Sequence, residues 1–269
     1  MDGTARQGGP ADDRRVVIVT GASSGIGRAT ALRLGAQGMT VVLAARRASE
    51  LESLSAEIER SGGRALAVAT DVTRMDDIER LTTEAMSLSG RIDALVNVAG
   101  VGRSHSIMSD DADVEHMLAV NLLAPIRLMR AVVPIMIAQG SGSIVNIGSV
   151  AGEIGINGTY SATKFGLRGM TDSVRRELAG SGIGVTLIEP GYIDTPLTAG
   201  RAGRMPGPDI VAHAVEAALR RPRRRVIVPG KYRLAVFLSA ALPGIVDRRF
   251  AGKAAEKPVP AAAPPGPRG

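Results

Sequence analysis

The chain has 269 residues, 45% of them hydrophobic, which is enough to bury the core of one large domain. It contains no cysteine, which excludes disulfides, thiolate metal sites and cysteine nucleophiles. The 2% aromatic content argues against stacking platforms for single-stranded nucleic acid, although the net charge of +7 is compatible with acidic partners.

The two ends of the chain differ from its middle. Residues 1–13 are polar and contain Gly and Pro, and residues 251–269 are rich in Ala and Pro, so both segments are predicted to be disordered. No N-terminal segment combines positive charge with an apolar core, and no apolar run reaches the ~20 residues that span a bilayer. We therefore expect a cytoplasmic protein with one domain over residues 14–250.

The first predicted elements form a phosphate-binding pattern. Residues 15–20 are typical of a buried strand, and they run into Gly21-Ala-Ser-Ser-Gly25-Ile-Gly27 before a predicted helix over 28–35. Glycines permit a tight turn and a close approach of the backbone to pyrophosphate, and the helix N-terminus offers free N–H groups. The pattern predicts a dinucleotide site.

The next predicted strand, 40–45, is followed by Arg46 and Arg47. A site that prefers NAD usually has an acidic residue here for the ribose 2′-hydroxyl. A guanidinium can instead bind a 2′-phosphate with two hydrogen bonds. The sequence therefore predicts NADP(H) in preference to NAD(H), the alternative being a basic strand end with no ligand.

Strands and helices alternate along the rest of the chain, which predicts an α/β fold with a single doubly wound parallel sheet of about seven strands and helices on both faces. Ligands bind such sheets at the carboxyl ends of the strands, where Gly21, Arg46, Asp71 and Asn97 fall. The later elements are expected at helix 49–60, strand 65–69, strand 92–98, helix 113–138 with an interruption at Asn121, strand 143–147, helix 160–179, strand 185–189, helix 210–219 and strand 225–229.

Tyr160 and Lys164 lie four residues apart at the start of a predicted helix, so they share one face. A tyrosine is a weak acid with an unperturbed pKa of about 10, and a nearby positive charge lowers the pKa by favouring the phenolate. The pair is typical of proton transfer, but a solvated helix face also carries such pairs. Ser149, in the turn after the preceding strand, adds a hydroxyl to the same region.

In their order and spacing these motifs resemble the short-chain dehydrogenase/reductase superfamily, in its main branch with a Tyr-x-x-x-Lys active site. The resemblance covers residues 15–229. The motifs are TGASSGIG at 20–27, NVAG at 97–100, VNLL around Asn121, Ser149, YSATK at 160–164 and PGYIDT at 190–195.

The resemblance implies a role for each motif. Tyr160 would be the general acid in reduction, Ser149 would donate to the substrate carbonyl, Lys164 would hold the nicotinamide ribose, and Asn121 would organise a water chain. Asn97 would steady the central strand, and Asp71 and Val72 would lie beside the adenine. The implied cofactor-binding set is Gly21, Ser23, Ser24, Gly25, Ile26, Gly27, Arg46, Arg47, Asp71, Val72, Asn97, Ala99, Gly100, Tyr160, Lys164, Pro190, Gly191, Ile193 and Thr195.

The chain departs from the family pattern in two places. NVAG replaces the commoner NNAG, and Ser149 lies eleven residues before Tyr160, which is closer than usual. The shortened segment falls in the 153–159 loop, which in the family helps to line the substrate entrance. We expect an altered substrate shape rather than loss of Ser149 from the site. Residues 198–208, rich in Gly, Pro and Ala, are expected to form a mobile lid.

Residues 231–249 form an apolar segment with basic ends, and we predict one helix there. It is too short to span a membrane, but it could pack on its own domain, cover a dimer interface, close a substrate pocket or lie on a membrane surface. The basic cluster at 220–225 has no nucleic-acid reader motif beside it, so no nucleic-acid partner is predicted. His105, His116 and His213 show no ligand spacing, so no metal site is predicted.

The sequence thus predicts an NADP(H)-dependent oxidoreductase that interconverts a ketone or aldehyde with an alcohol, acting on a lipophilic small molecule as a homodimer or homotetramer. Two alternatives stay open. One is a 3-oxoacyl thioester reductase, and the other is a protein that binds NADP(H) as a signal without turnover.

Overall fold

The computed structural model describes residues 15–102, 109–200 and 203–251. The predicted N-terminal arm, most of the C-terminal tail, His105 and part of the predicted lid lie outside these residues. The strands are β1 (Val16–Thr20), β2 (Thr40–Ala45), β3 (Arg64–Ala69), β4 (Ala94–Asn97), β5 (Gly142–Ile147), β6 (Ile183–Pro190) and β7 (Arg225–Val228). The helices are α1 (Gly25–Ala36), α2 (Ala48–Arg60), α3 (Met75–Ser89), α4 (Asp111–Leu118), η1 (Ala119–Leu123), α5 (Ala124–Gln139), α6 (Ala151–Ile154), α7 (Gly158–Glu177), η2 (Pro196–Thr198), α8 (Asp209–Arg220), α9 (Tyr232–Ala241) and α10 (Pro243–Phe250).

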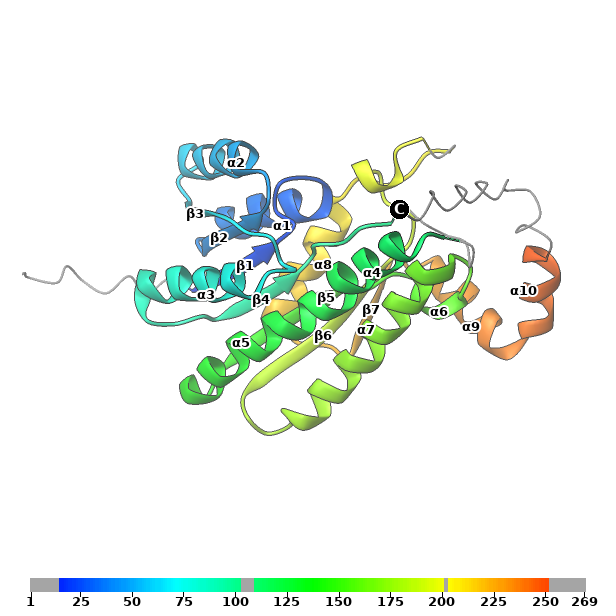
Figure 1. Ribbon diagram of the computed structural model, residues 1–269. Helices are drawn as coiled ribbons and strands as arrows, with labels where there is room; N and C mark the ends of the chain where they lie inside the picture. The colour runs from blue at the N-terminus through cyan, green and yellow to red at the C-terminus, as the bar shows by residue number, and fades with distance from the viewer. Residues whose placement is uncertain (1–14, 103–108, 201–202, 252–269) are drawn as a thin grey trace, which may run out of the picture.

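The strands form one parallel sheet in the order β3-β2-β1-β4-β5-β6-β7 (Figure 1). The order reverses between β1 and β4, so the chain winds outward in both directions from this pair, and a crevice is expected at the carboxyl ends of these two strands. The predicted doubly wound sheet is confirmed, and its strands match the predicted ranges to within a few residues.

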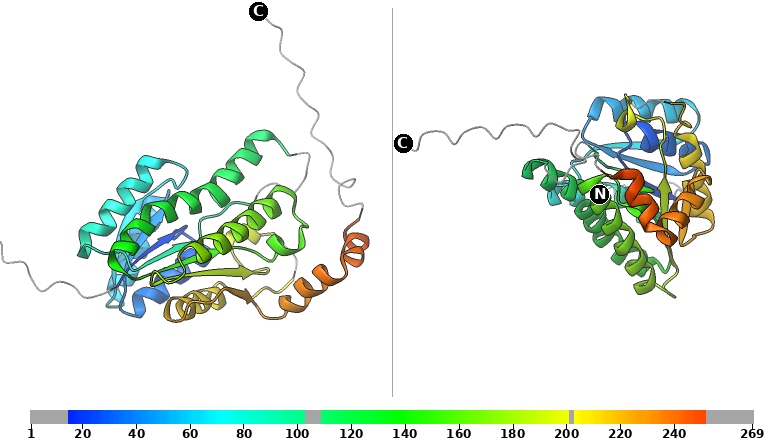
Figure 2. Two further views of the ribbon diagram at one scale, coloured as in Figure 1. Left: turned by 90° about the horizontal axis from the view of Figure 1, so that it is seen from below. Right: turned by 90° about the vertical axis from the view of Figure 1, so that its right-hand side faces the viewer.

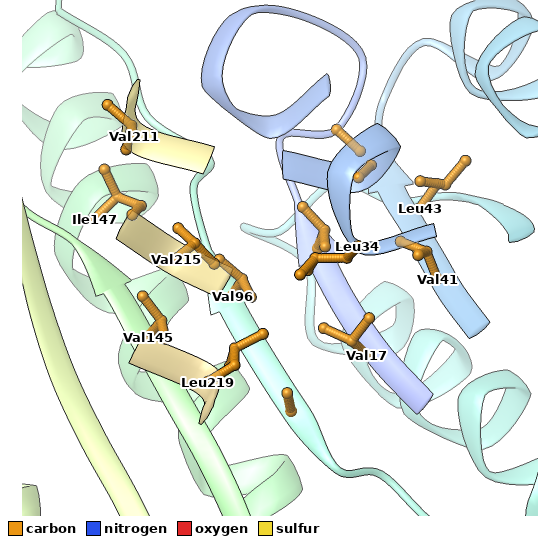
Figure 3. Packing of buried hydrophobic residues seen from close by; sticks show 14 of the residues in the cluster. Val17, Leu34, Val41, Leu43, Val96, Val145, Ile147, Val211, Val215 and Leu219 are labelled. Carbon is orange, nitrogen blue, oxygen red and sulfur yellow. The ribbon is translucent and has the colours of Figure 1, made fainter. Parts of the chain in front are cut away.

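Helices cover both faces of the sheet, and the strands are apolar on both sides for that reason. One face packs against α1, α2 and α8, and the other packs against α3, α5 and α7. Figure 3 shows the first face, where Leu34 of α1 and Val211, Val215 and Leu219 of α8 meet side chains of β1, β2, β4 and β5. The two apolar layers fix the strand ends, and therefore the loops, relative to one another.

The interruption predicted at Asn121 is a π-helix. The segment η1 widens the helix by one residue between α4 and α5, and Asn121 is fully buried within it. Such π-bulges are frequent at functional sites because they re-aim one side chain. The continuous helical segment Asp111–Gln139 is also long and apolar enough, by composition, to cross a membrane, which the sequence reading did not anticipate. Its buried face, however, packs in the core of the domain.

The C-terminal segment is two helices rather than the single helix predicted over 231–249. α9 ends at Ala241 and α10 begins at Pro243, whose ring cannot continue the preceding helix but suits the first turn of a new one. Both helices lie past the end of β7, away from the sheet (Figures 1 and 2).

Candidate active site

The glycine loop brings the end of β1, the start of α1 and the segment after β4 into close backbone contact. Gly21 has φ +66°, and a Cβ on it would lie 2.9 Å from Ala99 Cα. A Cβ on Gly27 would lie 2.2 Å from the Gly21 carbonyl oxygen. The first turn of α1 therefore closes tightly on the end of β1, which leaves the N-terminus of α1 open to an anion. A dinucleotide pyrophosphate fits this cradle.

Replacing Gly27 with Ala is expected to destabilise the domain by roughly 3 kcal/mol, because the added methyl group overlaps the Gly21 carbonyl. The midpoint temperature of thermal unfolding should fall, and the Kd for NADPH should rise. Gly169→Ala is the matched control, since that glycine lies in α7 with nothing within 4 Å of its Cβ position. The control should stabilise the protein slightly, and a harmless Gly27→Ala would show that the loop is not tightly closed.

A cleft of about 510 Å³ opens at the point where the strand order reverses. It is shaped by the ends of β1, β2, β3 and β4 together with the segment that follows β6. The predicted cofactor residues that line it are Gly21, Ser23, Ser24, Gly25, Ile26, Gly27, Arg46, Arg47, Asp71, Val72, Ala99, Gly100 and Thr195. The lining also includes residues outside the predicted set, namely Ala45, Thr70, Val98, Val101, Val120, Pro196 and Leu197.

One end of the cleft is basic. The Arg47 guanidinium donates hydrogen bonds to Ser23 Oγ at 2.9 and 3.3 Å, so it reaches across the glycine loop. Asp71 lies close by: burial alone would raise the pKa of its carboxyl, but the Thr73 hydroxyl and amide donate to it and Arg46 lies near, so the pKa is lowered overall. Asp71 is thus held as a carboxylate near Arg46, and both Arg46 and Arg47 line the cleft.

The NVAG segment is tied to β1 by a residue that the motifs did not single out. Thr20 Oγ1 accepts hydrogen bonds from the amides of Val98 and Ala99, at 3.0 and 3.1 Å. Asn97 lies behind this segment, where its amide donates to Asn146 Oδ1 of β5. This contact fits the expected role in steadying the central strands. Asn97 itself does not line the cleft, and neither do Tyr160, Lys164 and Ile193 of the predicted cofactor-binding set.

Asn121 is hydrogen-bonded on both sides of its amide. Its Oδ1 accepts from the Val101 amide at 2.9 Å, and its Nδ2 donates to the Val101 carbonyl at 2.8 Å and to Thr163 Oγ1 at 3.3 Å. A Cβ on Gly100 would lie 3.4 Å from Asn121 Oδ1 and 3.8 Å from Lys164 Nζ. Asn121, Gly100 and Lys164 therefore meet at one wall of the site.

Lys164 is 5% exposed and donates to the Ile147 carbonyl at 3.0 Å. Its Nζ lies 5.8 Å from the centroid of the Tyr160 ring, one helical turn away. Burial lowers the pKa of Lys164 to about 8. The group remains mostly protonated at neutral pH, so it places a positive charge beside Tyr160. The edge of the Tyr160 ring faces Gly102, next to Leu197, which lines the cleft.

Ser149 lies in the turn between β5 and α6. Its Oγ accepts a hydrogen bond from the Ala151 amide at 3.1 Å. The flanking backbone continues the β5–β6 pairing, with the Gly148 amide bonded to the Ile188 carbonyl at 2.7 Å and the Val150 amide to the Pro190 carbonyl at 3.0 Å. The shortened loop thus keeps Ser149 at the carboxyl edge of the sheet.

The segment after β6 closes the other end of the site. Thr195 packs against the glycine loop, because a Cβ on Gly25 would lie 3.2 Å from its side chain. Ile193 is buried, and its carbonyl accepts from Thr195 Oγ1 and Thr198 Oγ1. Pro190 and Gly191 stand outside the cleft lining, and Gly191 lies against the Tyr232 ring.

This geometry agrees with the comparisons to known proteins. The chain matches the family model of the short chain dehydrogenases over residues 15–204, and it belongs to that family. It is 35% identical over 224 residues to the ketoacyl reductase HetN of Nostoc sp., a match that covers 80% of this chain and 78% of that protein.

Two solved structures are similar over most of the chain. A variant of actinorhodin polyketide ketoreductase with NADPH has a TM-score of 0.76 at 29% identity, covering 81% of this chain and 97% of that one. A metagenomic short-chain oxidoreductase in complex with NADP has a TM-score of 0.70 at 36% identity, covering 80% and 96%. The predicted family is confirmed. Within the described residues, no group of three or more His, Asp or Glu side chains could hold a metal ion.

Proposed function

We propose that this protein is an NADP(H)-dependent oxidoreductase that interconverts a ketone or aldehyde with an alcohol. The observation that carries the proposal is the buried Lys164 beside Tyr160, next to a dinucleotide-sized cleft with a basic end. Lys164 adjoins the cleft at Gly100, and Tyr160 adjoins it near Leu197. A nicotinamide cofactor would supply or accept the hydride.

The chain's own residues supply the proton and the electrostatic stabilisation. Hydride addition builds negative charge on the carbonyl oxygen, and hydroxyl donors from Tyr160 and Ser149 would stabilise it. Tyr160 delivers the proton as general acid, and the positive charge of Lys164 favours the phenolate that remains. Asn121, held by Val101 and Thr163, shapes the wall at which Lys164 would regain a proton from water.

A preference for NADP(H) over NAD(H) follows from the basic end of the cleft. Arg46 and Arg47 follow β2 at the position where a carboxylate would bind the 2′-hydroxyl, and guanidinium groups there attract a 2′-phosphate. The bond from Arg47 to Ser23 ties Arg47 to the glycine loop, so Arg46 is the guanidinium that we assign to the 2′-phosphate.

The substrate is proposed to be lipophilic. A second hollow of about 320 Å³ lies beside the segment after β6, and it combines apolar and aromatic side chains with two cations. Its lining is Tyr192, Gly203, Arg204, Met205, Pro206, Lys231 and Tyr232. An acyl thioester with an anionic carrier group would also suit such a lining, and the name of the relative HetN favours that alternative.

The test is NADPH consumption by the purified protein with a panel of lipophilic ketones, aldehydes and 3-oxoacyl thioesters. Turnover of free lipophilic carbonyls supports the main proposal, and turnover restricted to thioesters supports the alternative. A protein that binds NADPH but reduces nothing in the panel would instead fit a cofactor-sensing role. The presence of both Tyr160 and Lys164 argues against that role, because sensing needs neither.

The exposed apolar side chains of α9 and α10 favour contact with an anionic membrane surface. Leu234, Phe237 and Ile245 are 64%, 66% and 62% exposed, so the domain itself does not cover them. Exposed Lys231 and Arg248 stand near the two ends of this apolar surface. Pairing the same face in a symmetric dimer would bring like charges together, whereas anionic lipid matches both the charge and the apolar surface. A homodimer or homotetramer would then use another face.

Phe237→Ser is expected to weaken binding to vesicles of phosphatidylcholine and phosphatidylserine by about tenfold, because a phenyl group leaves the lipid interface. Ile137→Ser is the matched control, since Ile137 is also exposed but lies on α5. Cosedimentation measures the binding, and truncation after Gly230 should abolish it. No vesicle binding by the full chain, or a fall in oligomer size with Phe237→Ser, would favour a partner-subunit contact instead.

A further inference from the structure

A cluster of two buried carboxyl groups and two partly buried arginines lies behind the loop that joins Ser149 to Tyr160. Arg168 Nη1 of α7 is 2.8 Å from Glu153 Oε1 of α6, and Arg225 Nη2 of β7 is 3.0 Å from Glu153 Oε2. Arg225 Nε also donates to Glu189 of β6. The carboxyl side chains are almost fully buried, at 6% and 1% exposure. The cluster joins four elements of the fold through charged contacts.

The cluster lies directly beside the catalytic face of α7. Arg168 is four residues after Lys164, so the two side chains share one face of the helix. Gly152, the neighbour of Glu153, packs on Lys164 so closely that a Cβ would lie 2.8 Å from the Lys164 carbonyl carbon. The ion pair between Glu153 and Arg168 therefore fastens α6 to α7 at the turn that carries Lys164.

The same cluster reaches Ser149 from its other side. A Cβ on Gly148 would lie 3.3 Å from Glu189 Cγ, so Glu189 lies beneath the residue that precedes Ser149. The Ala151 amide, at the start of α6, donates to Ser149 Oγ. Movement of α6 would therefore move the donor that orients the Ser149 hydroxyl.

We propose that Glu153, held by Arg168 and Arg225, is a positioning residue that fixes α6 and thereby aims the Ser149 hydroxyl at the substrate carbonyl. Glu153 is the one charged residue between Ser149 and Tyr160, in the loop where this chain is shorter than its family pattern. A buried ion pair costs much desolvation, and its best-attested use is to select one arrangement rather than to add stability. The proposal rests on the proposed reductase function.

Glu189 adds a dependence on pH. Burial and the hydrogen bond shared with Glu153 raise the pKa of Glu189 to about 8, against the opposing effect of Arg225. The folded protein therefore holds a proton that the unfolded chain releases above its ordinary pKa of 4.5. Stability from this proton is present at low pH and is lost as pH rises through about 8. The charged groups at this point are Glu153 from α6 and Arg225 from β7, with Arg168 of α7 on the far side of Glu153.

Glu153→Gln is the main test, with kcat and KM measured on the best carbonyl of the panel. We expect kcat to fall by about 10- to 100-fold with the Kd for NADPH unchanged, because the misplaced hydroxyl acts on the chemical step. Glu189→Gln should retain activity at neutral pH, since it copies the protonated side chain. The melting temperature of the wild type, relative to Glu189→Gln, should fall between about pH 4.5 and pH 8; Lys164 is present in both proteins and cancels.

Asp172→Asn is the matched control. Asp172 lies on the same helix and also pairs with two arginines, Arg175 and Arg224, each at 3.0 Å, but these pairs join α7 to itself and to the residue before β7 rather than to α6. The control should leave kcat unchanged. If Glu153→Gln folds poorly, Arg168→Gln breaks the same ion pair and should lower kcat in the same way. If both variants fold, their kcat effects should not add in the double variant.

Wild-type kcat in Glu153→Gln, or an equal loss in Asp172→Asn, overturns the positioning role while leaving the reductase proposal intact. Additive effects of Glu153→Gln and Arg168→Gln overturn it as well. Failure of the wild type and of Asp172→Asn to reduce any carbonyl in the panel would instead contradict the proposed function itself.

Discussion

Replacing Tyr160 with Phe is expected to lower kcat for carbonyl reduction by about 10³-fold, because general acid catalysis by a positioned side chain contributes about 10²–10⁴-fold and the variant also loses a donor to the developing oxyanion. The Kd for NADPH should change by less than about threefold, because the lost hydroxyl sits at the carbonyl rather than at the phosphates. Such a change is small on a scale where about 1.4 kcal/mol corresponds to tenfold. A variant that binds NADPH normally but has lost turnover is folded, so its defect lies in catalysis.

The matched control for this variant is Ser173→Ala. It removes a hydroxyl from the solvent-exposed face of the same helix, α7, so it tests whether any loss of a hydroxyl there lowers activity. Rates are followed by NADPH absorbance, and cofactor binding by fluorescence titration. Retained turnover in Tyr160→Phe would remove Tyr160 from the proton-transfer step and leave Ser149 or a water molecule as the acid.

The parts of the fold that depend on local sequence were predictable. Buried parallel strands are apolar on both faces, so β1 and β2 stand out as short β-branched runs, and the glycines between β1 and α1 mark the turn. Parallel strands with intervening helices place the strand ends at one edge, which is why Gly21, Arg46 and Asp71 could be assigned to one cleft before the structure was known.

Contacts between residues distant in sequence were not predictable. Glu153 and Arg225 are far apart in the chain, and the sequence marks Arg225 only as part of the basic cluster at 220–225. In the structure, Arg224 pairs with Asp172 and Arg220 with Glu216, so three arginines of this cluster contact carboxylates. Their charges are paired with carboxylates of the same domain, which a count of basic residues cannot reveal.

Two further features could be recognised only from the path of the backbone in the structure. An Asn inside an apolar helix signalled an interruption, but it could not specify a π-helix that points Asn121 at Val101 and Thr163. Thr20 looks like an ordinary strand residue, and only its bonds to Val98 and Ala99 show that it connects β1 to β4 at the cleft. Polar residues that satisfy backbone amides at a strand crossing carry no periodic signal.

Reversing the charge of Arg46 should change the cofactor preference. Arg46→Asp is expected to weaken the binding of NADPH by about 100-fold, while the affinity for NADH changes little. The variant removes a charge-assisted contact to the 2′-phosphate, worth about 1.5–3 kcal/mol, and adds repulsion. NADH has a 2′-hydroxyl instead, for which a carboxylate is the usual partner. Kd values for both cofactors at low and high salt measure the effect, which should shrink with added salt.

Arg60→Asp is the matched control for this change, since it makes the same charge reversal on the exposed last turn of α2, away from the cleft. Arg47→Gln distinguishes the two neighbouring arginines: Arg47 is already bonded to Ser23, so its loss should loosen the glycine loop and weaken both cofactors. An equal loss of affinity for NADPH and NADH in Arg46→Asp would place Arg46 at the adenine or the loop rather than at the 2′-phosphate. A loss of affinity for NADPH alone, which Arg60→Asp does not share, would assign the cofactor preference to Arg46, the residue that directly follows β2.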